Sequence, residues 1–196
     1  MSTRQKECET MKLGFDVDGV ISDFVGSFAK VLGSHYGLSL VEPDFYCYDL
    51  DLILGITKEQ RDKFITTGLF RNLKLIPGAK TALRKFKVEG HDIFILTSRG
   101  DHLTEVTIDW LRDKGIPYSR LLTLNGGEKH LADVDLDLVV EDNLAEAIGL
   151  ARRFKVLLFD RPWNRSLNVE RLFKRVHNWG EVIKEVKLAR ANHQTS

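Results

Sequence analysis

The sequence predicts an α/β fold in which a doubly wound parallel sheet carries a small helical cap inserted after its first strand. Short apolar runs alternate with amphipathic helical patterns, several of the runs end in a polar or acidic residue, and one long stretch interrupts the alternation. Short apolar runs of this kind are typical of parallel strands that are buried on both faces and joined by helices.

Four runs have the character of buried strands, at residues 11–15, 92–96, 138–140 and 156–159. The first three are followed by Asp16, Thr97 and Glu141, which begin loops. Parallel strands end at a common edge of a sheet, and open α/β sheets bind their ligands there. We therefore expect these polar side chains to gather at one edge.

Helical patterns separate the strands, at residues 78–87, 103–114 and 144–154. Each carries apolar residues at helical spacing. Gly90 and Gly115 end the first two, and Asn143 can cap the third. Near the C-terminus, we expect residues 167–186 to form helical structure that packs against the sheet. We expect the polar residues 187–196 to form a frayed tail.

A long stretch after the first strand breaks this rhythm, because more than about fifty residues precede Pro77 without a strong strand. Residues 21–36 and 57–67 predict helices, joined by an aromatic segment at 45–48. The stretch is either a cap over the site or a set of extra packing helices. Its position favours a cap, because loops at that edge carry function.

We accordingly divide the chain into an α/β core, residues 1–22 and 75–196, and a helical cap, residues 23–74. Aromatic residues of the cap could stack on a planar substrate, although core packing is the alternative for most of them.

Composition excludes several classes of protein. The 196 residues are 43% apolar and 29% charged, with a net charge of +1, which provides no electrostatic footprint for a nucleic acid polymer. Cys8 and Cys47 have no CxxC spacing, and no apolar run is long enough to span a bilayer. We expect a cytoplasmic protein that binds neither nucleic acid nor membrane; the composition leaves its oligomeric state open.

Asp16 and Asp18, followed by Gly19, are the strongest chemical signal in the chain. Two carboxylates one residue apart at a strand end diverge to opposite faces, and a turn after the second can bring both back to one crevice. Such a pair could share a divalent cation and combine nucleophilic with acid/base chemistry. Taken alone, the pair could equally cap and turn the strand end.

Three further positions complete a candidate site. Thr97 could bond a phosphoryl oxygen, Lys129 could neutralise an anion, and Asp142 could complete an oxygen-rich shell for Mg²⁺. Each has an alternative role: Thr97 as a turn cap, Lys129 as a surface lysine, and Asp142 as a helix cap. By contrast, we expect Pro162, Trp163 and Asn164 to form a turn with the indole packed on the core.

The order of these signals is more specific than any one of them. The chain runs Asp-x-Asp-Gly, strand-Thr-Ser, Lys, strand-acid-Asp, and this order resembles the four motifs of the haloacid dehalogenase superfamily, whose members are mostly Mg²⁺-dependent phosphatases. A narrower resemblance is to bacterial-type members of the 5′(3′)-deoxyribonucleotidase family. It is carried by residues 16–24, 76–79, 96–99, 140–143 and 158–164.

The resemblance implies a Rossmann-like core with a helical cap and a phosphomonoesterase of the 5′-nucleotidase type. Asp16 would be the nucleophile that forms an aspartyl-phosphate, and Asp18 the general acid and base. Mg²⁺ would be held by Asp16, Asp142 and the backbone carbonyl of Asp18. Some members have paired aspartates where this chain has Glu141 and Asp142, so we assign the metal to Asp142.

The same resemblance implies that Thr97 and Lys129 cradle the phosphoryl oxygens, with Ser98 and Arg99 as auxiliaries. Arg99 could equally pair with a nearby acid. The implied substrate is a nucleoside (deoxy)monophosphate. The alternatives are another small phosphate ester such as a sugar phosphate or, from a different class, a phosphate-responsive binding protein. A binding protein of the response-regulator receiver type would place its acidic residues, hydroxyl and lysine in a different order.

Overall fold

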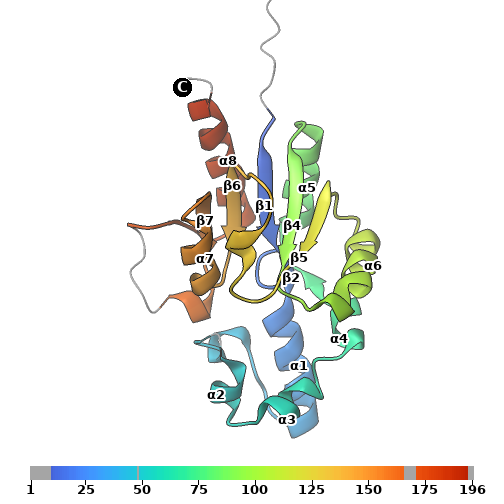
Figure 1. Cartoon of the computed structure of the whole chain (residues 1–196). Coiled ribbons are helices and arrows are strands. Elements are labelled where there is room, and N and C mark those ends of the chain that lie inside the picture. Colours follow the sequence, from blue (N-terminus) through green and yellow to red (C-terminus); the bar gives the residue numbers. More distant parts are fainter. Residues whose placement is uncertain (1–9, 48, 166–170, 194–196) are drawn as a thin grey trace, which may run out of the picture.

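The computed structural model describes residues 10–47, 49–165 and 171–193, and a six-stranded parallel sheet forms its centre (Figure 1). The strand order is β5-β4-β1-β6-β7-β8, and every neighbouring pair is parallel. The strands are β1 Lys12–Asp16, β4 Asp92–Thr97, β5 Arg120–Thr123, β6 Leu138–Glu141, β7 Lys155–Phe159 and β8 Lys174–Val176. The predicted fold class is confirmed.

Strand β1 lies in the middle of the sheet, and its register fixes the position of the site. Asp16 is opposite Leu96 of β4, and Phe15 is opposite Val140 of β6. The residues that follow these strands therefore meet at the carboxyl edge of the sheet. All four strands predicted from the sequence occur within one residue of their expected limits.

Helices cover both faces of the sheet. On one face lie α5 Ala79–Val88, α6 Thr104–Lys114 and α8 Trp179–His193, and on the other lies α7 Leu144–Leu150. The ring of Phe15 on β1 packs between Phe86 and Trp179, with ring centroids 6.0 and 5.5 Å away. Burial of one such ring contributes about 1.5–3 kcal/mol.

A group of helices gathers at the end of the sheet toward which β1 runs (Figure 1). It contains α1 Phe24–Tyr36, η1 Glu42–Asp44, α2 Leu50–Leu54, α3 Lys58–Asp62 and α4 Thr67–Arg71. The chain leaves the sheet through β2 Ser22–Asp23 and returns through β3 Lys74–Leu75, and these two strands pair antiparallel. The division into a core and a cap at 23–74 stays a prediction.

Two helices of this group differ from the expected limits. The helix predicted at 57–67 is two helices, because Thr57 caps α3 by accepting from the N–H of Gln60, and Thr66 caps α4 by accepting from the N–H of Leu69. The helix predicted from residue 21 begins at Phe24, after Asp23 accepts from the N–H of Gly26.

The C-terminal prediction was partly wrong. Residues 174–176 form the edge strand β8, and α8 begins only at Trp179, after Asn178 accepts from the N–H of Glu181. Helix α8 then continues to His193, well into the stretch that we expected to be frayed. Residues 167–170 and 194–196 of these predictions, like Cys8, lie outside the described residues.

Among the described residues, every helix falls short of the length and apolarity needed to cross a bilayer. Within the described part of the chain, Cys47 is a free thiol.

His91, directly before β4, predicts a pH-dependent stability. Its buried Nδ1 accepts a hydrogen bond from the N–H of Met11 (3.0 Å), and burial lowers the pKa of its imidazole, against the opposing effect of Glu89 and Asp137. The unfolded state therefore takes up a proton more readily than the folded state, so this group costs stability as the pH falls below about 6.5.

We expect His91→Asn, which keeps an acceptor for Met11 but does not titrate, to lose this dependence. The measurement is the free energy of unfolding in urea at about pH 7.5 and about pH 5.5. The contributions of the other titrating groups cancel in the difference between the unfolding free energies of the wild type and the variant. A difference that stays constant between the two pH values would contradict the argument.

Candidate functional site

Lys129 lies at the centre of a buried charge cluster. Its Nζ donates to Oδ1 of Asp16 at 2.5 Å and to Oε2 of Glu141 at 2.8 Å. Asp16 ends β1, Glu141 ends β6, and Lys129 begins the short helix η3 Lys129–Leu131. The side chains of Lys129, Asp16 and Glu141 are only 3%, 7% and 1% exposed. The lysine is therefore a buried ion-pair partner of the candidate nucleophile.

Glu141 and Asp142 are adjacent acids with different surroundings. Oε1 of Glu141 accepts from the backbone N–H groups of Asp142 and Asn143, so both of its oxygens are engaged. Oδ2 of Asp142 accepts from the indole N–H of Trp163 at 2.9 Å. Asp16 and Asp142 each keep one carboxylate oxygen that makes no hydrogen bond to a described residue.

Gly19 allows the loop after β1 to pass close to Asp142. Its φ is +94°, and a Cβ built there would lie 2.1 Å from Oδ2 of Asp142. Its N–H donates to the carbonyl of Ser22, and its own carbonyl accepts from Nε of Arg161 at 2.7 Å. A side chain at this position would be strained and would displace Asp142.

The cluster holds more negative than positive charge. Burial raises the pKa of Asp16 to about 8, with further raising by Glu141 and Asp18, although Lys129 opposes the shift. Burial, Asp16 and Glu141 also raise the pKa of Asp142 well above its usual value. Burial would lower the pKa of Lys129, but Asp16 and Glu141 outweigh it and hold that pKa well above the ordinary range. An additional cation would relieve this repulsion.

The donor set fits a hard divalent cation. One oxygen from each of Asp16, Glu141 and Asp142 lies within 4.8 Å of the others. Carboxylate oxygens are the ligands that Mg²⁺ prefers. Because Lys129 and two backbone N–H groups already occupy Glu141, the oxygens left for a cation belong to Asp16 and Asp142.

The side chain of Asp18 does not join this cluster. Its two oxygens accept from Nε and Nη2 of Arg99, at 2.7 and 2.6 Å, and Oδ1 also accepts from the hydroxyl of Ser22 at 2.7 Å. Of the two roles that the sequence left open for Arg99, the structure therefore has the pairing with an acid.

Thr97 and Ser98 follow β4 at the same edge. Thr97 is buried, and its hydroxyl accepts from the N–H of Arg99 at 3.3 Å. The exposed Ser98 donates to Oε1 of Glu146 at 3.3 Å, and the same oxygen accepts from the N–H of Gly127. Glu146, buried in the first turn of α7, thus ties the end of β4 to the loop before Lys129.

Sequence reasoning missed the contributions of Trp163, Glu146 and Arg161. The indole of Trp163, on the short helix η4 Pro162–Asn164, packs in the core as expected but also donates to Asp142. Arg161 bonds Gly19 and, through Nη1, Oε1 of Glu42 in the helical group. No sequence signal identifies these partners, because each contact joins residues that are far apart in the chain.

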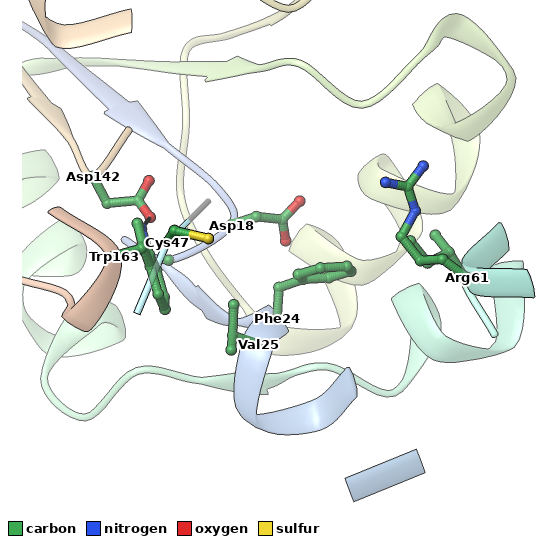
Figure 2. Close-up of a pocket in the computed structure, with 9 residues that line it drawn as sticks. Asp18, Phe24, Val25, Cys47, Arg61, Asp142 and Trp163 are labelled. Atoms are coloured by element: carbon green, nitrogen blue, oxygen red, sulfur yellow. Dashed lines mark hydrogen bonds between the residues drawn. The ribbon is translucent and has the colours of Figure 1, made fainter. Parts of the chain in front are cut away.

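Two hollows open beside the cluster. The larger, about 630 Å³, is lined by Asp16, Asp18, Ser98, Arg99 and Lys129 of the predicted site and by residues of the helical group that include Phe24, Ile65 and Phe70. The smaller, about 150 Å³, is mostly apolar and lies against Asp18 and Asp142. Figure 2 shows Asp142 and Trp163 at one side of it, with Phe24 and Val25 from α1 below.

Comparison with known proteins identifies a family that matches nearly the whole chain. The family model described as 5′ nucleotidase, deoxy (pyrimidine), cytosolic type C protein matches residues 10–192. A nucleotidase of Clostridium acetobutylicum is 31% identical over 180 residues, covering 89% of this chain and 92% of its own length.

Solved structures show the same fold at low sequence identity. A haloacid dehalogenase family hydrolase from Deinococcus radiodurans, solved with bound phosphate and sodium, has a TM-score of 0.66 at 15% identity and covers 93% of this chain and 97% of its own. A hydrolase from Bacillus subtilis with the same fold, bound to magnesium, has a TM-score of 0.61 at 14% identity and covers 90% of this chain and 98% of its own.

Gly19→Ala tests the close approach of the loop to Asp142, and Gly37→Ala is its matched control. Both glycines have a positive φ, but a Cβ at Gly37 would meet no atom within 4 Å. We expect each variant to lose about 1 kcal/mol or more of stability through backbone strain. We expect Mg²⁺ to raise the melting temperature of the wild type and of Gly37→Ala, but not that of Gly19→Ala. An equal response of both variants to Mg²⁺ would contradict the geometry.

Proposed function

Because the chain belongs to the 5′ nucleotidase, deoxy (pyrimidine), cytosolic type C family of haloacid dehalogenase-like phosphatases, we propose that it hydrolyses nucleoside (deoxy)monophosphates with Mg²⁺ through an aspartyl-phosphate intermediate. The observation that carries the proposal is the buried cluster in which Lys129 holds one oxygen of Asp16, while the other makes no hydrogen bond to a described residue. The family is described as cytosolic, which supports a cytoplasmic location for this chain.

In the first step, one carboxylate oxygen of Asp16 attacks phosphorus in line. The bond from phosphorus to the ester oxygen breaks, and Asp18 supplies the proton that the leaving oxygen needs. Lys129 keeps Asp16 oriented and offsets the charge of the phosphoryl group, and Thr97 and Ser98 lie at the same edge of the sheet to bond its oxygens. The product alcohol departs and Asp16 remains phosphorylated.

In the second step, water attacks the same phosphorus atom and Asp18 takes a proton from it. The bond to Asp16 breaks, so inorganic phosphate leaves and the carboxylate is restored. Asp16, Asp142 and the backbone carbonyl of Asp18 would hold Mg²⁺, whose positive charge would offset the negative charges of the nucleophile and the phosphate.

The size of the larger hollow supports a nucleotide as substrate. Its volume of about 630 Å³ is within the range of ligand pockets, about 300–1,000 Å³. Charged residues of the site line one part of it, and Phe24 and Phe70 line another. The rings of Phe24 and Phe70 stack with centroids 5.8 Å apart, which provides an apolar wall for a planar base.

The test is phosphate release from ribo- and deoxyribonucleoside 5′- and 3′-monophosphates, with sugar phosphates alongside, with and without Mg²⁺. We expect Mg²⁺-dependent release that favours the nucleotides. Asp16→Asn should lower turnover by about 10³-fold or more, because it removes the nucleophile. Asp113→Asn, at an exposed position in α6, is the matched control and should keep full activity.

Each alternative has its own outcome in this experiment. Release from sugar phosphates in preference to nucleotides would keep the chemistry and overturn the substrate. No release from any ester would overturn the enzymatic proposal and favour a phosphate-responsive binding protein. Substantial turnover by a well-folded Asp16→Asn variant would overturn the aspartyl-phosphate mechanism.

A further inference from the structure

The carboxylate of Asp18 is held on both oxygens by one residue. Nε of Arg99 donates to Oδ2 at 2.7 Å and Nη2 donates to Oδ1 at 2.6 Å, so the guanidinium and the carboxylate form a two-bond fork. Such forks fix orientation as well as adding attraction. The hydroxyl of Ser22 donates a third bond, to Oδ1 at 2.7 Å.

Arg99 is itself held from both sides. Its side chain is 3% exposed, and Nη1 donates to the hydroxyl of Thr107 in α6 at 3.2 Å. The centre of the guanidinium lies 4.7 Å from the ring of Phe70, which belongs to α4 in the helical group, and 5.8 Å from the indole of Trp110 in α6. Arg99 therefore links Asp18 to the helical group as well as to α6.

This geometry argues against a primary role for Arg99 in binding phosphate. To reach a phosphoryl oxygen with its fork, Arg99 would have to abandon Asp18. Arg99 is buried and Asp18 is partly buried, so breaking the pair would leave the charge of Arg99 without its partner. Lys129 already provides a buried ammonium beside Asp16.

We propose, on the basis of the function proposed above, that Arg99 is the positioning residue of Asp18 and that Phe70 of the helical group keeps Arg99 in place. The bonds to Asp18 also identify the oxygen that exchanges the proton. Oδ1 accepts two hydrogen bonds and Oδ2 accepts one from the described residues. A carboxylate oxygen has two acceptor sites, so Oδ2 keeps one for the proton taken from water or given to the leaving oxygen.

Arg99→Lys keeps the charge and removes the fork, and it separates the two roles of Arg99. If Arg99 positions Asp18, kcat should fall about 10- to 100-fold, which is part of the ~10²–10⁴-fold that a positioned acid or base contributes. KM and inhibition by inorganic phosphate should change by less than about threefold. A raised KM with weakened phosphate inhibition and a nearly unchanged kcat would overturn the proposal in favour of a phosphate ligand.

A double-mutant cycle tests whether Arg99 acts through Asp18. In an Asp18→Asn background, Arg99→Lys should lower kcat by no more than about twofold, because the interaction is already lost. If the double variant loses kcat by the product of the two single fold losses, the proposal is overturned. Ser22→Ala removes one neutral donor to Asp18 and is the second variant, should Arg99→Lys fail to fold; its smaller loss of kcat should also vanish in the Asp18→Asn background.

Phe70→Leu tests the link to the helical group, with Phe64→Leu as the matched control. The ring of Phe64 contacts His35 and Tyr36 and lines neither of the two hollows beside the cluster. We expect Phe70→Leu, but not Phe64→Leu, to lower kcat, and only when Asp18 is present. An equal effect of the two variants would overturn the role of Phe70.

Failure of the proposed function is distinguishable from failure of this inference. Wild-type activity is measured first, and the cycle uses whichever ester the wild type hydrolyses best. If the wild type is active but the fold losses of kcat from Arg99→Lys and Asp18→Asn multiply in the double variant, only the positioning role is overturned. A wild type that is inactive on every ester overturns both.

Discussion

The ion pairs of Lys129 with Asp16 and Glu141 are the constraint on which the rest of the site depends. They join the end of β1, the end of β6 and the start of η3 at a buried position. Removing one partner of a buried pair typically costs about 3–5 kcal/mol, because the other charge is left uncompensated. The lysine thus fixes where the carboxylates lie, and Gly19 and Trp163 are the local adaptations that let Asp142 approach them.

Two arginines connect the loop after β1 to the helical group. Arg161 bonds the carbonyl of Gly19 and the carboxylate of Glu42, and Arg99 bonds Asp18 and stacks on Phe70. Each side chain is mostly buried. The loop after β1 is therefore held against the helical group by charge and ring contacts as well as by the chain connection through β2 and β3. A shift of the helical group would therefore move Arg99 and change the position of the Asp18 carboxylate.

The sequence was sufficient for the sheet centre and for the residues at its edge, because buried strands form apolar runs and their ends carry the polar residues. It was insufficient where tertiary contacts decide. Arg120–Thr123 is only partly buried, so β5 has no apolar run to identify it, and β8 is a short edge strand whose residues 174–176 are not apolar as a group. The contacts of Trp163 and Glu146 span about twenty residues or more and follow no local period.

Glu141 and Asp142 show why residue type alone could not divide the roles of the site. Both acids follow buried residues of β6, and both are themselves buried. Glu141 uses one oxygen for Lys129 and the other for two backbone N–H groups, so it is satisfied without a cation. Among the described residues Asp142 accepts only from the indole of Trp163, so one of its oxygens is not engaged. Burial, Asp16 and Glu141 raise its pKa, so a cation would stabilise its charged form. Glu141 therefore orients the lysine, and Asp142 is the acid with capacity for a metal.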